Sequence, residues 1–311
     1  MATPFPGLVL AIFGPTASGK TAVAEAIAQR IPADVVSADS MQVYEGLQIL
    51  TAQPESPTRL VAIWPLSHEA SVADYARLAH AAVDEILDGG RTAIVTGGTG
   101  LYFRAALTDL ALPPAPAAGA RERWDAFYDA HGALHAHGRL QALDPEAAAG
   151  LHPNDRRRVV RALELAEAGS SLARERDRLW SDETRHPTLV FGLEVAPDEL
   201  RRRIDARGRA MFEAGAVEEV QRALAAGPVS HTARYAHGLE DIATLPRPEA
   251  LEAMLARVRR YAAYQRKWMR RISGLITVDA DRSPDEVADE ILALARARQR
   301  LPARGGPRAD T

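Results

Sequence analysis

The stretch Gly14-Pro15-Thr16-Ala17-Ser18-Gly19-Lys20-Thr21 decides how the rest of the chain is interpreted. It matches the phosphate-loop pattern G-x-x-x-x-G-K-[ST], which is informative where a strand precedes it and a helix follows it. The apolar run 8–13 predicts that strand, and the good helix formers at 22–28 predict that helix. The stretch therefore predicts a loop that binds phosphate through backbone N–H groups and a helix N-terminus.

Two side chains of this loop have expected roles in binding phosphate. Lys20 supplies a mobile positive charge, and the hydroxyl of Thr21 is a ligand for Mg²⁺ held against the phosphates. Kinases, NTPases and a few transferases share such a loop, so the loop alone does not define a reaction.

Composition limits the class of protein. The 311 residues suffice for two structural units, and 47% hydrophobic with 25% charged residues is ordinary for a globular protein. The absence of cysteine excludes disulfides, thiolate zinc sites and thiol catalysis. No apolar run is long enough to span a bilayer, so a cytoplasmic protein is expected. With a net charge of -3, any binding of nucleic acid must come from local basic patches.

The order of predicted elements indicates an α/β fold. Further strands are predicted at 33–40, 91–96, 188–195 and 275–279, with helices between them. This order predicts a P-loop NTPase-like core with a central parallel sheet and helices on both faces. The proline-rich stretch 112–119 is interpreted as a domain boundary. We expect residues 1–111 and 187–301 to form the core, 112–186 an inserted all-helical domain, and 302–311 a disordered tail.

Polar residues follow the second and third predicted strands. In an open α/β sheet the carboxyl ends of the strands bind ligands, so Asp39 is expected near the phosphates. It is a candidate general base, a candidate Mg²⁺ partner or simply a cap. Gln42 and Tyr44 are candidates for reading a base.

The strand at 91–96 ends without the acid that many P-loop ATPases place there, which argues against a motor or switch NTPase. Gly97-Gly98-Thr99 follows it. Its glycines indicate either a backbone held close to a ligand, with Thr99 as a donor, or a tight turn.

Three predicted helices are rich in arginine. The helix at 156–165 is a candidate for contacts to a phosphate backbone, although a solvated face has the same pattern. The helix at 199–212 carries cations that could clamp a diphosphate. The helix at 257–271 mixes arginines with Tyr261, Tyr264 and Trp268, a pattern that suits RNA unless the aromatic rings pack inward.

Several motifs stand together in the order of a known family. They are the loop at 14–21, Ser37-Ala38-Asp39-Ser40 with Gln42-Val43-Tyr44, Gly97-Gly98-Thr99-Gly100-Leu101-Tyr102, and His152-Pro153-Asn154-Asp155-Arg156 with Arg161-Ala162-Leu163-Glu164. From about Leu8 to about Asp279 the chain resembles the bacterial tRNA dimethylallyltransferases, or IPP transferases. The set is specific, although no single motif is.

The resemblance implies transfer of a dimethylallyl group from dimethylallyl diphosphate to the exocyclic amine of the adenosine 3′-adjacent to the anticodon. The loop would then hold a prenyl diphosphate and not ATP. It implies that Asp39 accepts the proton of the amine, while Lys20, Arg207 and Mg²⁺ at Thr21 neutralise the leaving diphosphate. Arg207 stands close to Arg202 and Arg203, so the register of this arginine stays open.

The resemblance also implies partners. The tRNA anticodon stem-loop would be clasped by the helical insertion, by a monomer with neither an obligate protein partner nor a membrane. The residues matching tRNA-contacting positions of the family are Asp39, Ser40, Met41, Gln42, Thr99, Arg121, Arg157, Arg158 and Arg161. One departure is Tyr235-Ala236-His237-Gly238-Leu239, which stands where a Gly-Tyr pair is typical.

Three alternatives remain. An adenylate isopentenyltransferase would use the same donor on a free nucleotide, for which a clasping insertion is unnecessary. A small-molecule kinase would turn over ATP at the phosphate loop. A non-catalytic RNA-binding protein would not need an intact Lys20, Thr21 and Asp39.

Overall fold

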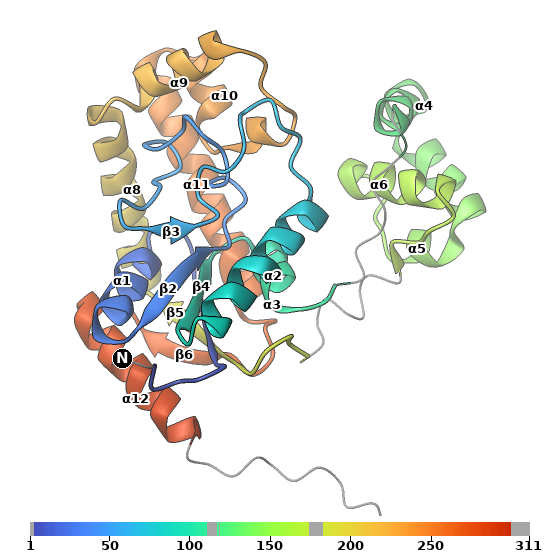
Figure 1. Ribbon diagram of the computed structural model, residues 1–311. Helices are drawn as coiled ribbons and strands as arrows, with labels where there is room; N and C mark the ends of the chain where they lie inside the picture. The colour runs from blue at the N-terminus through green and yellow to red at the C-terminus, as the bar shows by residue number, and fades with distance from the viewer. Residues whose placement is uncertain (1–2, 111–116, 118, 174–182, 300–311) are drawn as a thin grey trace, which may run out of the picture. The chain divides into compact units, whose positions relative to one another are not determined.

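The computed structural model describes residues 3–110, 117, 119–173 and 183–299 (Figure 1). The chain divides into two compact units, one of Met1–Thr108 with Thr184–Thr311 and the other of Asp109–Glu183. The second unit thus begins and ends three residues before the expected insertion at 112–186. The expected tail at 302–311 lies outside the described residues, as does most of the proline-rich stretch.

The first unit is built on a parallel sheet, which confirms the predicted α/β class. Its strands in the described residues are β1 (Val9–Phe13), β2 (Ala33–Ser37), β3 (Thr58–Arg59), β4 (Thr92–Gly97), β5 (Thr188–Glu194) and β6 (Ile276–Asp279). They stand in the order β3-β2-β4-β1-β5-β6, and every neighbouring pair is parallel. The strand β3 has only two residues, too few to show a periodic pattern in the sequence.

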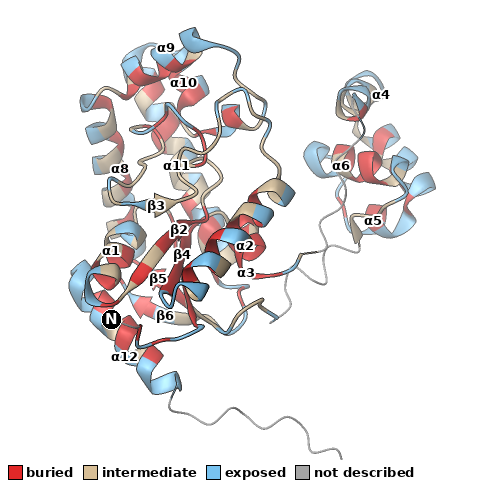
Figure 2. Ribbon diagram, viewed as in Figure 1, coloured by how far each residue is buried: buried red, intermediate tan, exposed pale blue. Residues whose placement is uncertain are grey.

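Helices cover both faces of this sheet. Leu10 and Ile12 of β1 share a hydrophobic cluster with residues of α1 (Lys20–Arg30) and α12 (Pro284–Gln299). Phe13 instead contacts Phe103 of α3 (Gly100–Leu107), with ring centroids 5.1 Å apart. The sheet face that meets α3 is also covered by α2 (Val72–Asp88). Figure 2 shows the central strands buried between these layers, as expected for strands that are apolar on both sides.

Helices after β5 complete the first unit. They are α8 (Pro197–Glu213), α9 (Ala216–Ala226), the 3₁₀ turn η1 (Ala233–Tyr235), α10 (Leu239–Thr244) and α11 (Arg247–Met269). The helix expected at 257–271 is the second half of α11, which begins directly after Pro246. Two of its arginines pair with acids from other elements: Arg257 lies 2.9 Å from Asp241, and Arg259 lies 2.6 Å from Asp205.

The second unit is helical in its described residues. It contains α4 (Ala120–Leu143), α5 (Pro145–Ala149) and α6 (Arg156–Glu167), packed around a small core that includes Leu140 and Leu163. Gly132, with φ 81° and ψ 167°, breaks α4 into two helical segments. Across the described part of the chain, no helix combines the length and apolar character that a membrane span requires.

Candidate active site

Three strand ends meet at the carboxyl edge of the sheet. Phe13 of β1 lies level with Gly97 of β4, and Ser37 of β2 lies level with Thr96. The loops that follow these strands are the phosphate loop, the segment beginning at Asp39, and the Gly97–Thr99 turn. The prediction that parallel strands deliver these loops to one edge is therefore confirmed.

The phosphate loop curls tightly between β1 and α1. Ala17 and Gly19 adopt left-handed φ values of 62° and 90°, as is typical of backbone turns that bind anions through their N–H groups. The Nζ of Lys20 donates a hydrogen bond of 2.8 Å to the carbonyl of Pro15, which folds the lysine back over its own loop. This geometry is suited to binding an anion.

A cavity of about 120 Å³ opens beside this loop. Thr16, Lys20 and Thr21 border it from the loop, Asp39 borders it from the segment after β2, and Arg207 borders it from α8. Apolar side chains from α8 and α11 complete much of its wall; they are Ile204, Met211, Met254, Leu255 and Val258. The cavity thus combines a cationic end with an apolar wall.

The charged groups of the cavity influence one another. Burial lowers the pKa of Lys20 to about 8; the carboxylate of Asp39 opposes this effect and the charge of Arg207 adds to it. Burial also lowers the pKa of Arg207, against the influence of Asp39. Within the described residues no acid lies at ion-pair distance from either cation, so both charges remain available to an anionic ligand.

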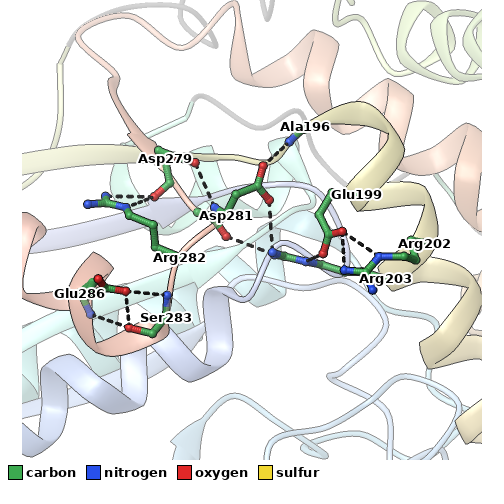
Figure 3. Close-up of polar contacts among 10 residues, drawn as sticks. Ala196, Glu199, Arg202, Arg203, Asp279, Asp281, Arg282, Ser283 and Glu286 are labelled. Carbon is green, nitrogen blue, oxygen red and sulfur yellow. Dashed lines mark hydrogen bonds and ion pairs between the residues drawn. The ribbon is translucent and has the colours of Figure 1, made fainter.

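The neighbouring arginines of α8 are engaged elsewhere. Figure 3 shows Arg202 and Arg203 held by Glu199, each at 2.6 Å, with Arg203 also 3.2 Å from Asp281. Arg207 lies one turn further along the helix and faces the cavity. Of these three arginines, Arg207 is the one that borders this cavity.

Thr99 connects the Asp39 segment to α11. The Oγ1 atom of Thr99 accepts the N–H of Ser40 at 3.3 Å and lies 3.1 Å from the hydroxyl of Tyr261. One carboxylate oxygen of Asp39 accepts the N–H of Met41 at 2.9 Å. Asp39 therefore stabilises its own turn while it borders the cavity, so the capping role and a chemical role are compatible.

Gln265 joins the phosphate loop to the Gly97–Thr99 turn, a contact that its neighbours in the sequence do not indicate. Its Oε1 accepts the N–H of Thr16 at 2.8 Å and its Nε2 donates to the carbonyl of Gly98 at 3.0 Å. A Cβ at Gly98 would lie 2.2 Å from this Nε2, so the glycine permits the close approach. Since protein atoms fill this space, the tight-turn interpretation of Gly98 is favoured over a ligand contact.

Replacing Gln265 with leucine is expected to lower the free energy of unfolding by about 2–3 kcal/mol, because two backbone groups lose their partner in a buried site. Urea denaturation measures this loss. The control is Gln221→Leu on the exposed face of α9, which should change stability by less than about 0.5 kcal/mol. Equal stability of the two variants would contradict the bridging role.

Comparison with known proteins places the chain in a family. The sequence model of the family described as IPP transferase matches residues 42–272, and that of isopentenyl transferase matches residues 7–59. The chain belongs to the IPP transferase family. A relative from Corynebacterium jeikeium, named tRNA dimethylallyltransferase, is 38% identical over 92% of this chain and 95% of its own length. Another of that name, from Thermobifida fusca, is 39% identical over 85% of this chain and 87% of its own length.

Solved structures agree with this assignment. A tRNA isopentenylpyrophosphate transferase from Bacillus halodurans superimposes with a TM-score of 0.67 at 30% identity, covering 94% of this chain and 98% of its own. A eukaryotic dimethylallyltransferase acting on tRNA gives a TM-score of 0.75 over 96% of this chain and 81% of its own. At 24% identity this second likeness supports the fold alone.

For this IPP transferase, the arginines predicted to contact tRNA lie in the second unit. Arg161 of α6 donates to Glu164 at 2.9 Å, and Arg121 of α4 lies 3.7 Å from the same carboxylate, which is fully buried. Arg158 is exposed and lies 3.8 Å from Asp155, and Arg157 is exposed. The buried Glu164 thus brings Arg121 and Arg161 together.

The candidates after β2 have different surroundings. Tyr44 is fully buried, with its hydroxyl 2.7 Å from Oγ1 of Thr232, so the interpretation of Tyr44 as a base-stacking residue was wrong. Gln42 borders the cavity, and its amide nitrogen donates to the carbonyl of Ala52 at 2.9 Å. Met41 also borders the cavity, and Ser40 is half-buried beside it.

Proposed function

We propose that the protein transfers a dimethylallyl group from dimethylallyl diphosphate to the exocyclic amine of the adenosine 3′-adjacent to the anticodon of tRNA, with release of diphosphate. Membership of the IPP transferase family supports this function. The observation that carries it is the cavity in which Lys20 and Arg207 provide two cations beside Asp39 and an apolar wall. An allylic diphosphate requires these features together: cations for the leaving group and apolar surface for the tail.

The proposed step is a displacement at C1 of the donor. The C1–O bond breaks, and its electron pair leaves with the diphosphate, where Lys20, Arg207 and the loop N–H groups stabilise the added charge. The amine nitrogen of adenine forms the new bond to C1. Asp39 accepts the proton that this nitrogen loses, so the amine leaves the reaction neutral.

We also propose that Mg²⁺ accompanies the diphosphate. Mg²⁺ usually keeps several waters and takes few protein oxygens beside substrate phosphates. The exposed hydroxyl of Thr21 borders the cavity and fits such a ligand. The described residues contain no cluster of three or more His, Asp or Glu able to hold a metal alone, which fits an ion shared with the substrate. The ion would neutralise charge on the leaving group.

We propose that the tRNA contacts Thr99 and the segment after β2, which consists of Asp39, Ser40, Met41 and Gln42. We propose that it also contacts the arginines of the second unit, which are Arg121, Arg157, Arg158 and Arg161.

The second unit also disfavours an adenylate isopentenyltransferase, since a free nucleotide has no stem to hold. β4 ends in Gly97 without an acid, which disfavours an ATP-dependent kinase. We propose a monomer without an obligate protein partner.

Labelled dimethylallyl diphosphate, Mg²⁺ and the protein, offered unmodified tRNA and AMP in parallel, test this function. Label is expected in tRNA and not in AMP. Label in AMP alone would establish the free-nucleotide alternative. If neither is labelled while ATP is consumed in a separate assay, the kinase alternative replaces the proposal.

The pKa of Lys20 gives the proposed reaction a pH signature. Protonated Lys20 is the form that neutralises diphosphate, so kcat/KM for the donor is expected to fall as the pH rises through about 8. Arg207→Gln removes a charge that lowers this pKa, so the fall should move to higher pH in that variant. The pH profile of the control Arg202→Gln should match the wild type. A fall at the same pH in all three proteins would contradict the coupling of Arg207 to Lys20.

A further inference from the structure

A buried carboxylate in the second unit has no part in the chemistry proposed above. The side chain of Glu164 on α6 is fully buried, and neighbouring residues of the same helix, such as Leu163, belong to the small core of this unit. Burying a charge is unfavourable unless it is paired, and a buried ion pair is seldom more stabilising than apolar residues of similar size. The effect of Glu164 therefore lies in the groups that it holds.

Glu164 holds two arginines that come from two different helices. Its Oε2 accepts a hydrogen bond of 2.9 Å from Nη1 of Arg161, which lies one turn earlier on α6. Its Oε1 lies 3.7 Å from Nε of Arg121 on α4. The two guanidinium groups are thus placed on the two oxygens of one carboxylate, where their charges would repel each other if the anion were absent.

Most of the side-chain N–H groups of these two arginines are unused. The contact of 3.7 Å from Arg121 to Glu164 is too long for a hydrogen bond, and so is its contact of 3.9 Å to Asp125, which lies closer to Arg156. Within the part of the chain that the structure describes, the guanidinium of Arg121 donates no hydrogen bond, and that of Arg161 donates only to Glu164. Both side chains also reach the surface, with exposed fractions of 35% and 28%.

The charges of this cluster are not balanced. The exposed Arg123 of α4 has a carboxylate close to it, because Glu167 lies at 2.6 Å. Arg121 and Arg161 instead share Glu164, so two cations face one buried anion. A phosphate group matches this arrangement, because guanidinium groups bind its oxygens through paired N–H groups.

We propose that Glu164 positions Arg121 and Arg161 as a fork that binds one backbone phosphate of the tRNA. This inference rests on the proposed function and adds a positioning residue to the proposed contact with tRNA. Glu164 does not touch the RNA; its charge offsets the repulsion between the two guanidinium groups and fixes their direction. Because phosphate contacts set the register of a nucleic acid on a protein, the fork orients the tRNA and takes no part in the transfer step.

Glu164→Gln tests this role, because the amide keeps the shape of the side chain and loses its charge. Filter binding of unmodified tRNA without donor, at several salt concentrations, measures Kd. This Kd is expected to rise by about tenfold, within the range for coupled residues of one salt-bridge network. The slope of log Kd against log salt concentration should become smaller by about one, as for the loss of one phosphate contact. In the transfer assay, KM for tRNA should rise while kcat and the Kd of the donor stay unchanged.

The direction of this effect separates positioning from simple charge. The substitution removes a negative charge, so a role through long-range electrostatics alone would strengthen the binding of tRNA. Tighter or unchanged binding by Glu164→Gln would therefore overturn the proposal. The matched control is Glu167→Gln on the same helix, which removes the partner of Arg123 and should leave the Kd for tRNA unchanged. An equal loss of affinity in this control would also overturn the proposal.

Arg121→Gln keeps the proposal testable if Glu164→Gln does not fold, because Glu164 then retains its hydrogen bond from Arg161. Arg121→Gln is expected to raise the Kd for tRNA. The effects of Arg121→Gln and Glu164→Gln should be less than additive, since each breaks the same fork. An unchanged Kd in Arg121→Gln, or strictly additive effects in the double variant, would refute the fork.

Failure of this inference is distinguishable from failure of the proposed function. Binding of tRNA is measured without the donor, so its dependence on Glu164 does not require transfer. If label were transferred to AMP alone while the Kd for tRNA still depended on Glu164, the proposed acceptor would be wrong and the fork would stand. If tRNA were labelled while its Kd and KM did not depend on Glu164, the fork alone would be refuted.

Discussion

Replacing Asp39 with asparagine is expected to lower kcat for dimethylallyl transfer by about 10²- to 10⁴-fold, the range attributed to a positioned general base. The substitution is close to isosteric, and the amide oxygen of asparagine can still accept the N–H of Met41, which Asp39 accepts at 2.9 Å. The turn after β2 should therefore persist while the proton acceptor is lost. Single-turnover transfer of labelled dimethylallyl to tRNA measures the effect on the chemical step.

The control for this variant is Asp88→Asn at the exposed end of α2, which should retain the wild-type rate. The magnesium dependence distinguishes the two chemical roles open to Asp39. If Asp39 acted chiefly through the metal, raising the Mg²⁺ concentration would recover most of the activity of Asp39→Asn. A loss of activity that persists at saturating Mg²⁺ supports the role of Asp39 as general base. Recovery of activity would indicate that another group accepts the proton.

Replacing Lys20 with methionine is expected to lower kcat/KM for the donor by about 10²- to 10³-fold, because a preorganised cation at the leaving group is lost. Methionine retains an unbranched stem of similar length. The same substitution should not lower the free energy of unfolding at neutral pH. The pKa of Lys20 is about 8 in the fold, below its ordinary value of 10.5, so its charged form is disfavoured by folding. Activity and stability should therefore respond in opposite directions.

The chain provides a matched control, because Lys267 is its other lysine. Lys267 is exposed on α11, and Lys267→Met should leave KM for the donor unchanged. Donor titrations at fixed tRNA concentration measure both variants, and urea denaturation measures their stability. An unstable Lys20→Met protein would indicate that the hydrogen bond from Lys20 to Pro15 outweighs the burial of the charge.

The parts predicted correctly from the sequence depend on short segments. The phosphate loop needs only the run from β1 into α1, and the position of Asp39 follows from the rule that parallel strands end at one edge. The cap of α2 is likewise local, since Oγ of Ser71 accepts the N–H of Asp74 at 3.0 Å. Each of these features is decided by residues close together in the chain.

The parts not predicted depend on distant partners. Gln265 meets Thr16 across 249 positions, and an isolated glutamine in a basic helix has no pattern that indicates such a contact. Tyr44 was interpreted as a base-reading residue because its contact with Thr232, 188 positions away, cannot be inferred from the neighbouring residues in the sequence.

The location of β1 between β4 and β5 has a consequence for synthesis of the protein. Val9 of β1 pairs with Ala93 of β4 on one side and with Thr188 of β5 on the other. The second edge of β1 therefore stays unpaired until β5, which follows the whole second unit in the chain, has been synthesised. During translation the nascent chain therefore carries an apolar strand with one open edge, a template for pairing with other chains. A chain terminated just before β5 is expected to aggregate, although its phosphate-loop sequence is complete. Chaperone dependence should therefore be greatest while the ribosome translates residues 109–187.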